Sequence, residues 1–332
     1  MSTFSSFTGQ SFRLPPPPLT EKNLPNQAGR VFIVTGGYAG VGLDLARILY
    51  SHDGTIYIAG RSPSKATAAI DAIRASFPAS KGRLEFLRVD LADLSTIQPA
   101  AAAFLAREAR LDVLTNNAGV MTPPAGARSA QGHELQLATN VLGHHLLTQQ
   151  LLPLLRKTAT VAPAGSVRVT WAASIAVDLT SPANGVAFDG AGAPVAHADQ
   201  SANYGQSKAG NVFLASELAR REGGGGGAVV TNAWNPGNLR TELQRHQGWL
   251  LRTVLDKALL YESVYGAYTV LWAGWAEEAG RPENSGRYVA PWGRFHGNRK
   301  DVEDGRRSGE EGGTGAAAML WDWCEKETRA FV

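Results

Sequence analysis

The sequence predicts a doubly wound α/β fold, in which one domain holds a seven-stranded parallel sheet with helices on both faces. Short apolar runs rich in β-branched residues alternate with longer segments whose apolar residues have helical spacing, and this alternation is typical of such a sheet. The chain of 332 residues also has 44% hydrophobic and 18% charged residues, a composition that excludes wholesale disorder.

The predicted strands are apolar along their length, as strands buried on both faces of a sheet should be. The first run reads Val-Phe-Ile-Val-Thr and leads directly into a cluster of glycines. In chain order the seven predicted strands are 31–35, 55–59, 84–89, 112–115, 166–171, 228–233 and 287–289.

Segments with helical spacing separate these strands, and each is expected to connect two parallel neighbours. The predicted helices are 41–51, 64–77, 94–109, 133–156, 204–221 and 250–278, with a last short helix at 316–327. Two stretches without periodicity are predicted loops, namely 180–202, rich in Gly, Ala, Pro and Asp, and the glycine run 223–227.

The predicted organisation has a proline-rich N-terminal extension at 1–29, a main Rossmann-like domain at 30–293 and a C-terminal extension at 294–332. The first extension contains four consecutive prolines and lacks the cationic and apolar regions of a secretory signal. We interpret 294–315, which is charged and rich in glycine, as a solvated surface excursion. Polar residues interrupt the apolar stretches before they reach the ~20 residues of a membrane span, so no transmembrane segment is expected.

Charge and cysteine content exclude several classes of function. Lys and Arg number 32 against 29 Asp and Glu, a net charge of only +3, so no nucleic-acid partner is expected. The only cysteine, Cys324, excludes an intramolecular disulfide and a cysteine zinc cluster. The adjacent histidines His144 and His145 would point to different faces of a helix, so we expect no metal site there. A reducing, cytoplasmic location is the expectation.

The first predicted strand ends in Thr35-Gly-Gly-Tyr-Ala-Gly-Val-Gly42, and a predicted helix follows at once. Glycines let the backbone turn tightly and approach a pyrophosphate, while the helix N-terminus offers free N–H groups. A glycine cluster alone can also be a simple turn. Its place directly after the first strand favours a dinucleotide site.

Tyr204 and Lys208 are four residues apart on a predicted helix and therefore share one of its faces. A lysine ammonium near a phenol favours the ionised phenol, so this pairing is expected to lower the pKa of the tyrosine and make it a general acid and base. The alternative is a surface tyrosine and a surface lysine at a common spacing.

Together, these motifs resemble those of the classical short-chain dehydrogenase/reductases, over about residues 30–289. The long segment before Tyr204 and the Pro-Trp-Gly at 291–293 are similar to the retinol-dehydrogenase-like group, especially its fungal NADP-dependent reductases. The matching motifs, in the order of that family, are Thr-Gly-x-x-x-Gly-x-Gly at 35–42, Asn-Asn-Ala-Gly at 116–119, Asn140, Ser174, Tyr204-x-x-x-Lys208 and Pro236-Gly237.

The resemblance implies four catalytic residues. Tyr204 would be the general acid and base, and Lys208 would also hold the nicotinamide ribose. Ser174 would stabilise charge on the substrate oxygen, although a serine after a strand is usually a turn residue. Asn140 would bind a water that links Lys208 to solvent, whereas a mid-helix Asn can also bond its own backbone.

The cofactor implied is NADP(H), with NAD(H) as the alternative. Arg61 follows the second strand, where it would bind a 2′-phosphate, and Lys65 would add a second cation. Asp90 would bind the adenine amine, with a helix N-cap as its alternative role. The full set of expected cofactor-binding residues is Gly36, Tyr38, Gly40, Val41, Gly42, Arg61, Lys65, Asp90, Leu91, Asn117, Gly119, Tyr204, Lys208, Pro236, Gly237, Leu239 and Thr241.

The expected activity is oxidoreduction of a carbonyl/alcohol pair on a small molecule, and a non-redox cyclase, isomerase or cofactor-sensing role is the alternative. Two segments are expected to bind the substrate, the insert 179–202 and the region 238–260. Apolar residues such as Trp249, Leu250 and Leu255 suggest an apolar, aromatic or secondary-metabolite substrate, although they could equally be the core face of a helix. Pairing through 133–156 and 204–221 would give a homodimer or homotetramer.

Overall fold

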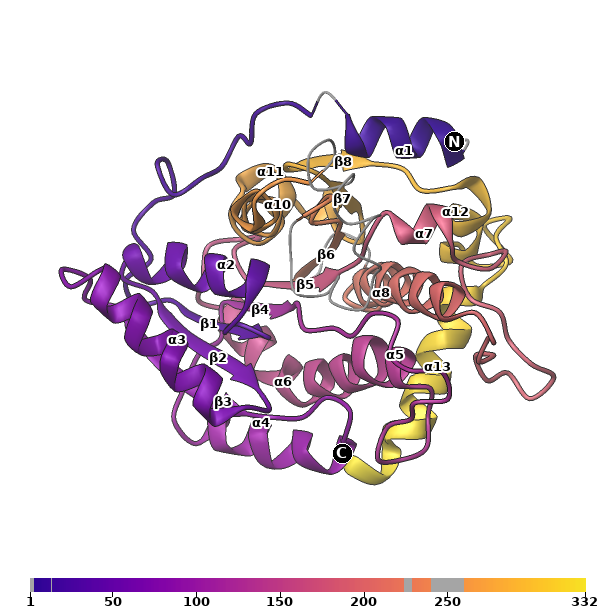
Figure 1. Ribbon diagram of the computed structural model, residues 1–332, viewed down its shortest axis with the longest axis horizontal. Coiled ribbons are helices and arrows are strands. Elements are labelled where there is room, and N and C mark those ends of the chain that lie inside the picture. The colour runs from indigo at the N-terminus through magenta and orange to yellow at the C-terminus, as the bar shows by residue number, and fades with distance from the viewer. Residues whose placement is uncertain (1–2, 13, 224–228, 240–259) are drawn as a thin grey trace.

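The structure, a computed structural model, describes residues 3–12, 14–223, 229–239 and 260–332. In this part of the chain one sheet runs in the order β3-β2-β1-β4-β5-β6-β7-β8, with helices on both of its faces (Figure 1). The order reverses between β1 and β4, which confirms the predicted doubly wound, Rossmann-like α/β fold. The strands are β1 Val31–Thr35, β2 Thr55–Gly60, β3 Arg83–Arg88, β4 Val113–Asn116, β5 Arg168–Ala172, β6 Val230–Trp234, β7 Tyr288–Ala290 and β8 Arg294–His296.

The predicted number of seven strands is wrong, because the described residues form an 8-stranded sheet. The additional strand, β8, turns back after Gly293 and pairs antiparallel with β7. Its three residues are only partly buried and include Arg294 and His296, so no apolar run marks them in the sequence. The seven predicted strands themselves are all present.

The longer helices agree with the predicted pattern and differ mainly at their ends. The predicted helix 133–156 is divided into a short turn, a π-helical segment and α6. Of the predicted helix 250–278, residues 250–259 lie outside the described residues. The helices are α1 Thr3–Ser11, α2 Gly40–Ser51, α3 Pro63–Ser76, η1 Leu94–Thr96, α4 Ile97–Leu105, α5 Leu135–Leu137, η2 Ala138–Leu142, α6 Gly143–Ala159, α7 Ala176–Leu179, α8 Gln200–Arg221, α10 Ser263–Trp275, α11 Glu277–Gly280, η4 Pro282–Asn284, α12 Lys300–Arg306, α13 Ala316–Thr328 and η5 Arg329–Phe331.

Both faces of the sheet are buried, each under its own group of helices. One core packs side chains of α4, α6, α8 and α13 against the sheet, and the other packs α2, α3 and α10. Val34 and Ile33, neighbours on β1, belong to opposite cores, since successive side chains of a strand point to opposite faces. Double-sided burial explains why the strands are apolar throughout.

Both terminal extensions contain structure that the sequence did not reveal. The proline-rich extension begins with helix α1, and its buried side chains, Ser6, Gln10 and Ser11, are polar. The interpretation of 294–315 as a solvated excursion is wrong, because it contains β8 and α12, and Val302 on α12 is fully buried. The buried side chains of α1 are polar, and β8 and α12 are short, so neither extension shows a clear hydrophobic pattern in the sequence.

No helix among the described residues is long and apolar enough to cross a membrane.

Candidate active site

The predicted site residues follow the carboxyl ends of the strands, where a doubly wound sheet binds its ligands. After β1 the chain enters the glycine loop, and Gly36 has a φ of 65°, a conformation that favours glycine. A Cβ atom on Gly42 would lie 2.7 Å from the carbonyl oxygen of Gly36 and 2.6 Å from Nδ2 of Asn117. The loop is therefore closed tightly upon itself at the start of α2.

Asn117 ties the glycine loop to the end of the neighbouring strand. Its side-chain Nδ2 donates to the carbonyl oxygen of Thr35 at 2.7 Å, and its backbone N–H donates to Oγ1 of Thr35 at 2.8 Å. Thr35 Oγ1 also contacts Nε2 of the buried His144 at 2.9 Å. Sequence reasoning missed Thr35 and His144 as parts of this network, because their link crosses from β1 to α6.

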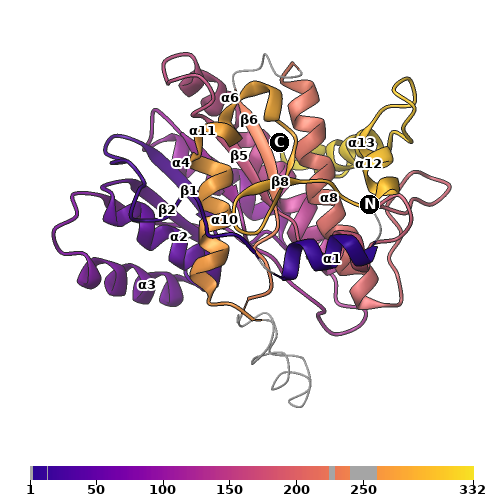
Figure 2. The same ribbon diagram turned by 90° about the horizontal axis from the view of Figure 1, so that it is seen from above.

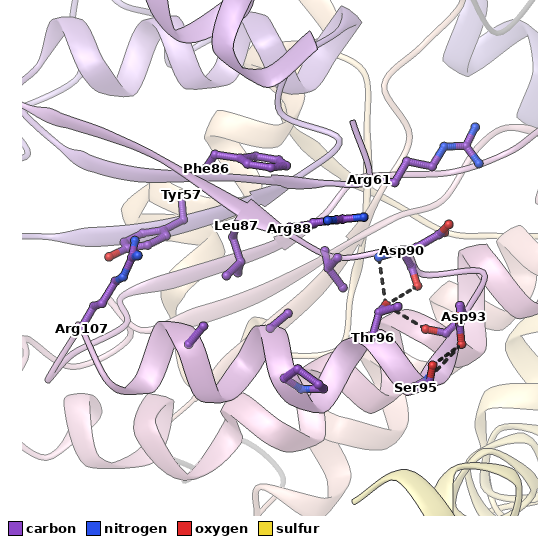
Figure 3. A pocket seen from close by; sticks show the side chains of 14 residues that line it. Tyr57, Arg61, Phe86, Leu87, Arg88, Asp90, Asp93, Ser95, Thr96 and Arg107 are labelled. Carbon is purple, nitrogen blue, oxygen red and sulfur yellow. Dashed lines mark hydrogen bonds between the residues drawn. The ribbon is translucent and has the colours of Figure 1, made fainter. Parts of the chain in front are cut away.

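A cavity of about 630 Å³ lies between strands β2 and β3, the segment that follows β3, and helix α4 (Figure 3). Arg61, Arg88 and Asp90 lie toward one end of it, and Tyr57 and Arg107 lie toward the other. Arg61 is exposed, and no ion pair to it or to Lys65 occurs within the described ranges. Arg61 is therefore a cation without an ion-pair partner in the described part of the chain.

Tyr38, whose position sequence reasoning left open, packs against the end of β2. A Cβ atom on Gly60 would lie 2.9 Å from the hydroxyl oxygen of Tyr38. The ring thus lies against Gly60, the residue before Arg61. Lys65 is exposed on the first turn of α3, where its backbone N–H donates to the capping Oγ of Ser62 at 3.4 Å.

The N-cap alternative for Asp90 is wrong. Asp93 caps the following helix, because its carboxylate accepts from the backbone N–H of Ser95. The carboxylate of Asp90 instead accepts from the backbone N–H of Ala92, at 3.0 Å, and Asp90 lines the cavity with Arg61. Leu91 is buried, and its carbonyl oxygen lies against Gly143 of α6.

The predicted catalytic side chains meet at the first turns of α8. Nζ of Lys208 donates to the carbonyl oxygen of Ala172 at 2.8 Å and lies 5.6 Å from the centre of the Tyr204 ring. Ser174 follows β5 at the same edge, and its Oγ accepts from the backbone N–H of Ala176 at 3.2 Å. The structure therefore brings these three residues together.

Burial raises the pKa of Tyr204 to about 12, and a hydrogen bond with Ser174 acts in the opposite direction. Burial also lowers the pKa of Lys208, to about 8. The expectation that Lys208 lowers the pKa of Tyr204 is not met in this structure. Loss of water around the phenol is the largest cause of its shift, and the Lys208 ammonium is instead bound to a carbonyl on β5. At neutral pH Tyr204 carries its proton.

Asn140 lies in the π-helical segment η2, directly before α6, and faces the same site. Its Oδ1 accepts from the backbone N–H of Val120 at 2.9 Å, and its Nδ2 donates to Oγ of Ser207 at 2.9 Å. A Cβ atom on Gly119 would lie 3.1 Å from Oδ1 of Asn140 and 3.5 Å from Nζ of Lys208. Gly119 is therefore the spacer that lets these two groups face one another. The water relay implied for Asn140 stays a prediction.

The segment after β6 closes the site on another side. Side chains of Val41, Pro236 and Leu239 converge on Gly266 of α10, where any Cβ atom would collide with them. Gly237 packs on Trp292, the central residue of the Pro-Trp-Gly sequence. Trp292 also contacts Tyr261 and Tyr265, at ring distances of 4.9 and 5.2 Å. Thr241 and the apolar residues Trp249, Leu250 and Leu255 lie outside the described residues.

The insert 179–202 is held against α8 on both sides of Tyr204. Gln206 accepts from the backbone N–H of Ala187 at 3.0 Å, and Asn203 accepts from that of His197 at 2.7 Å. Residues 180–199 form no helix or strand beyond an isolated bridge, in agreement with the predicted loop. Within the described ranges no group of three or more His, Cys, Asp or Glu side chains is arranged to hold a metal ion.

Comparison with known proteins gives a consistent result. A family model described as "short chain dehydrogenase" matches residues 30–182. The chain is 45% identical over 319 residues to a short-chain dehydrogenase/reductase of Phomopsis amygdali, covering 95% of this chain and 94% of that protein. It is 42% identical over 317 residues to the short-chain dehydrogenase/reductase pkfC of Emericella nidulans, covering 96% and 98%.

Solved structures with the same fold include an uncharacterised protein from Mycobacterium paratuberculosis. The TM-score is 0.67 at 27% identity, with 94% of this chain and 97% of that chain covered. The RhlG protein of Pseudomonas aeruginosa, solved with NADP, has a TM-score of 0.62 at 24% identity, with 80% and 95% covered. The second likeness shows the fold alone.

Proposed function

The chain belongs to the short-chain dehydrogenase/reductase family, and from this premise we propose that it is an NADP(H)-dependent reductase of a ketone or aldehyde. Members of the family are oxidoreductases that act on CH–OH and C=O groups with NAD(P). The observation that carries the finer proposal is the meeting of Tyr204, Lys208 and Ser174 next to the glycine loop and Gly119.

The residues present fit a dinucleotide. Glycines at 36 and 42 let the loop pack closely against Ala118 and Asn117, and the loop leads into the N-terminus of α2, the kind of helix end that binds a pyrophosphate. Arg61 supports NADP(H) over NAD(H), because it is an exposed cation without an acidic partner in the described structure. When bound, the reduced nicotinamide supplies the hydride.

The protein side of the reaction is the transfer of a proton and the stabilisation of charge. The substrate carbonyl oxygen would accept hydrogen bonds from Tyr204 and Ser174, and Tyr204 would donate its proton as the alkoxide forms. A phenol with a pKa of about 12 is protonated at cellular pH, the form that can donate a proton to the developing alkoxide. Lys208 lies beside Tyr204 and Gly119, where it would hold the ribose and return a proton through Asn140.

We further propose an apolar substrate, aromatic or derived from secondary metabolism. This proposal is supported by the aromatic side chains of Tyr261, Tyr265 and Trp292, which gather beside Gly237. The expected cytoplasmic location also belongs to this proposal. Its support is the single cysteine, which is free and buried on α13.

The test is a panel of aromatic ketones, quinones and aldehydes mixed with the protein and NADPH or NADH. We expect loss of the reduced-nicotinamide absorbance with at least one of them, faster with NADPH. If the protein binds NADPH but turns over no member of the panel, the non-redox, cofactor-sensing role becomes the better description.

A further inference from the structure

The N-terminal helix α1 lies beside β8 at the edge of the sheet (Figures 1 and 2), far in sequence from the residues it contacts. It has nine residues, and an isolated helix of that length is marginal in water. Its buried side chains are polar, with Ser6 0% and Gln10 1% exposed. These two residues are four apart and share one face of the helix. The helix is therefore held by polar contacts, which must be matched to be tolerated.

Gln10 has partners for both ends of its carboxamide. Its Nε2 donates to Oγ of Ser6 at 2.9 Å and lies 3.4 Å from Oδ2 of Asp178, on α7. Its Oε1 accepts from Nδ2 of Asn235 at 2.9 Å and from the hydroxyl of Tyr288 at 3.0 Å. Asn235 follows β6 and Tyr288 begins β7, so one side chain joins three separate elements.

Two of these partners, Tyr288 and Asn235, contact the backbone of the proposed active site. The hydroxyl of Tyr288 also lies 3.3 Å from the carbonyl oxygen of Ser174. Oδ1 of Asn235 accepts from the backbone N–H of Gly237 at 3.0 Å. A second contact of α1 acts at the same place, because Nδ2 of Asn238 donates to Oγ of Ser11 at 3.1 Å. Gln10 is thus linked to Ser174 through one residue, Tyr288, and to the Pro236–Gly237 segment through another, Asn235.

We propose that Gln10 is a positioning residue of the reaction, which fixes the distance between Ser174 and the Pro236–Gly237 segment through Tyr288 and Asn235. The N-terminal helix is then part of the active site. This inference rests on the proposed function, since it assigns Gln10 to the same site. Small displacements of reacting groups reduce turnover much more than they reduce binding of a cofactor held at its distant phosphates.

One substitution of Gln10 removes its hydrogen bonds, and a pair of substitutions reverses which side chain donates and which accepts. Gln10→Ala removes the acceptor of Asn235 Nδ2 and one of the two acceptors near the Tyr288 hydroxyl, leaving only the carbonyl oxygen of Ser174. Gln10→Glu keeps an acceptor for both but places a carboxylate against Asp178, which is fully buried. Combining Gln10→Glu with Asp178→Asn swaps amide and carboxylate and restores the set of donors and acceptors. Gln98→Ala, on the exposed face of α4, is the matched control.

Turnover of the carbonyl panel and binding of NADPH are measured for all five proteins, counting the wild type. We expect Gln10→Ala and Gln10→Glu to lower kcat by about 10-fold to 100-fold, with the Kd for NADPH changed less than about twofold. The Gln10→Glu, Asp178→Asn pair should recover most of kcat, and Gln98→Ala should match the wild type. An unchanged kcat in Gln10→Ala, or an equal loss of NADPH affinity, would overturn the inference.

Hydrogen exchange of the backbone amides gives a readout that does not depend on turnover. Gln10→Ala should speed exchange at 174–181 and 235–239, with no change in α3 or β2, and the double variant should reverse this. If these segments exchange as in the wild type, Gln10 does not position them, whatever the activity. If they exchange faster but even the wild type reduces no carbonyl compound, the positioning holds and the proposed function fails.

Discussion

Nζ of Lys208 lies 5.6 Å from the centre of the Tyr204 ring and points to the carbonyl oxygen of Ala172, which accepts its hydrogen bond at 2.8 Å. The lysine is therefore fixed to β5 while it faces the phenol. Since burial lowers the pKa of Lys208 to about 8, its charge depends on the surroundings of the site.

This buried lysine should make folding stability depend on pH. Its folded pKa is about 8 and its ordinary value is 10.5, so the unfolded chain binds more protons between these values. The free energy of unfolding therefore gains from this group as pH rises from 8 to 10.5, by at most about 3 kcal/mol. The free energy of unfolding, measured with urea at a series of pH values, should rise between pH 8 and 10.5 for the wild type and rise less for Lys208→Met. Parallel curves would show that Lys208 is not desolvated.

Arg61→Asp should reverse the preference for the 2′-phosphate. A carboxylate there repels the phosphate and can accept hydrogen bonds from ribose hydroxyls, so the ratio of kcat/KM for NADPH over NADH should fall by about 100-fold or more. Arg107→Asp, at the other end of the same cavity, is the control and should change the ratio little. If Arg107→Asp has the larger effect, the phosphate lies at the far end.

His145 should be a source of acid sensitivity. Burial lowers its pKa to about 3, and neither ring nitrogen has a hydrogen-bond partner within the described structure. The unfolded chain takes up a proton near pH 6.5 that the folded chain resists, so stability is lost as pH falls below 6.5. In the wild type the ring centres of His145 and Trp321 lie 4.7 Å apart, edge to face, and His145→Phe preserves this contact. At pH 5 the substitution should raise the free energy of unfolding by about 2 kcal/mol relative to the wild type.

The control for this measurement is His133→Phe. His133 makes a similar edge-on contact with Trp323, at 5.7 Å, but is partly exposed and lies 3.6 Å from Glu327. The free energy of unfolding of His133→Phe should therefore not exceed that of the wild type at pH 5. Equal gains from both substitutions would mean that an added phenyl ring, and not the removed imidazole, stabilises the fold.

We expect that the protein does not form a dimer through its two long helices, α6 and α8. Helix α13 packs along α8 and α6, with Leu320 and Trp321 buried against them. Because this face is covered, we expect a monomer of 35.2 kDa by light scattering. A chain that ends at residue 315 should expose the apolar face and self-associate. A full-length dimer of twice that mass would contradict this account.

Much of the fold and of the site could be predicted because it depends on local patterns. The strands are apolar runs, and Gly36, Tyr204 and Lys208 belong to spaced motifs on single elements. The missed features depend on polar or cross-chain contacts. Gln10 is a single buried polar residue and gives no periodic signal. Strand β8 has only three residues, and a polar residue stands at each end of it. The contact between Thr35 and His144 joins β1 to α6, which are far apart in the sequence. The pKa of Tyr204 depends on burial, which spacing along a helix does not report.

The proposed function depends on proton donation by Tyr204 in an NADPH-dependent carbonyl reduction. The most direct measurement is single-turnover reduction by Tyr204→Phe, with Tyr50→Phe, a buried tyrosine of α2, as the control. Proton donation by Tyr204 predicts that Tyr204→Phe loses at least about 100-fold in rate with unchanged NADPH affinity, whereas Tyr50→Phe reacts at the wild-type rate. Turnover by Tyr204→Phe within a few-fold of the wild type would contradict it.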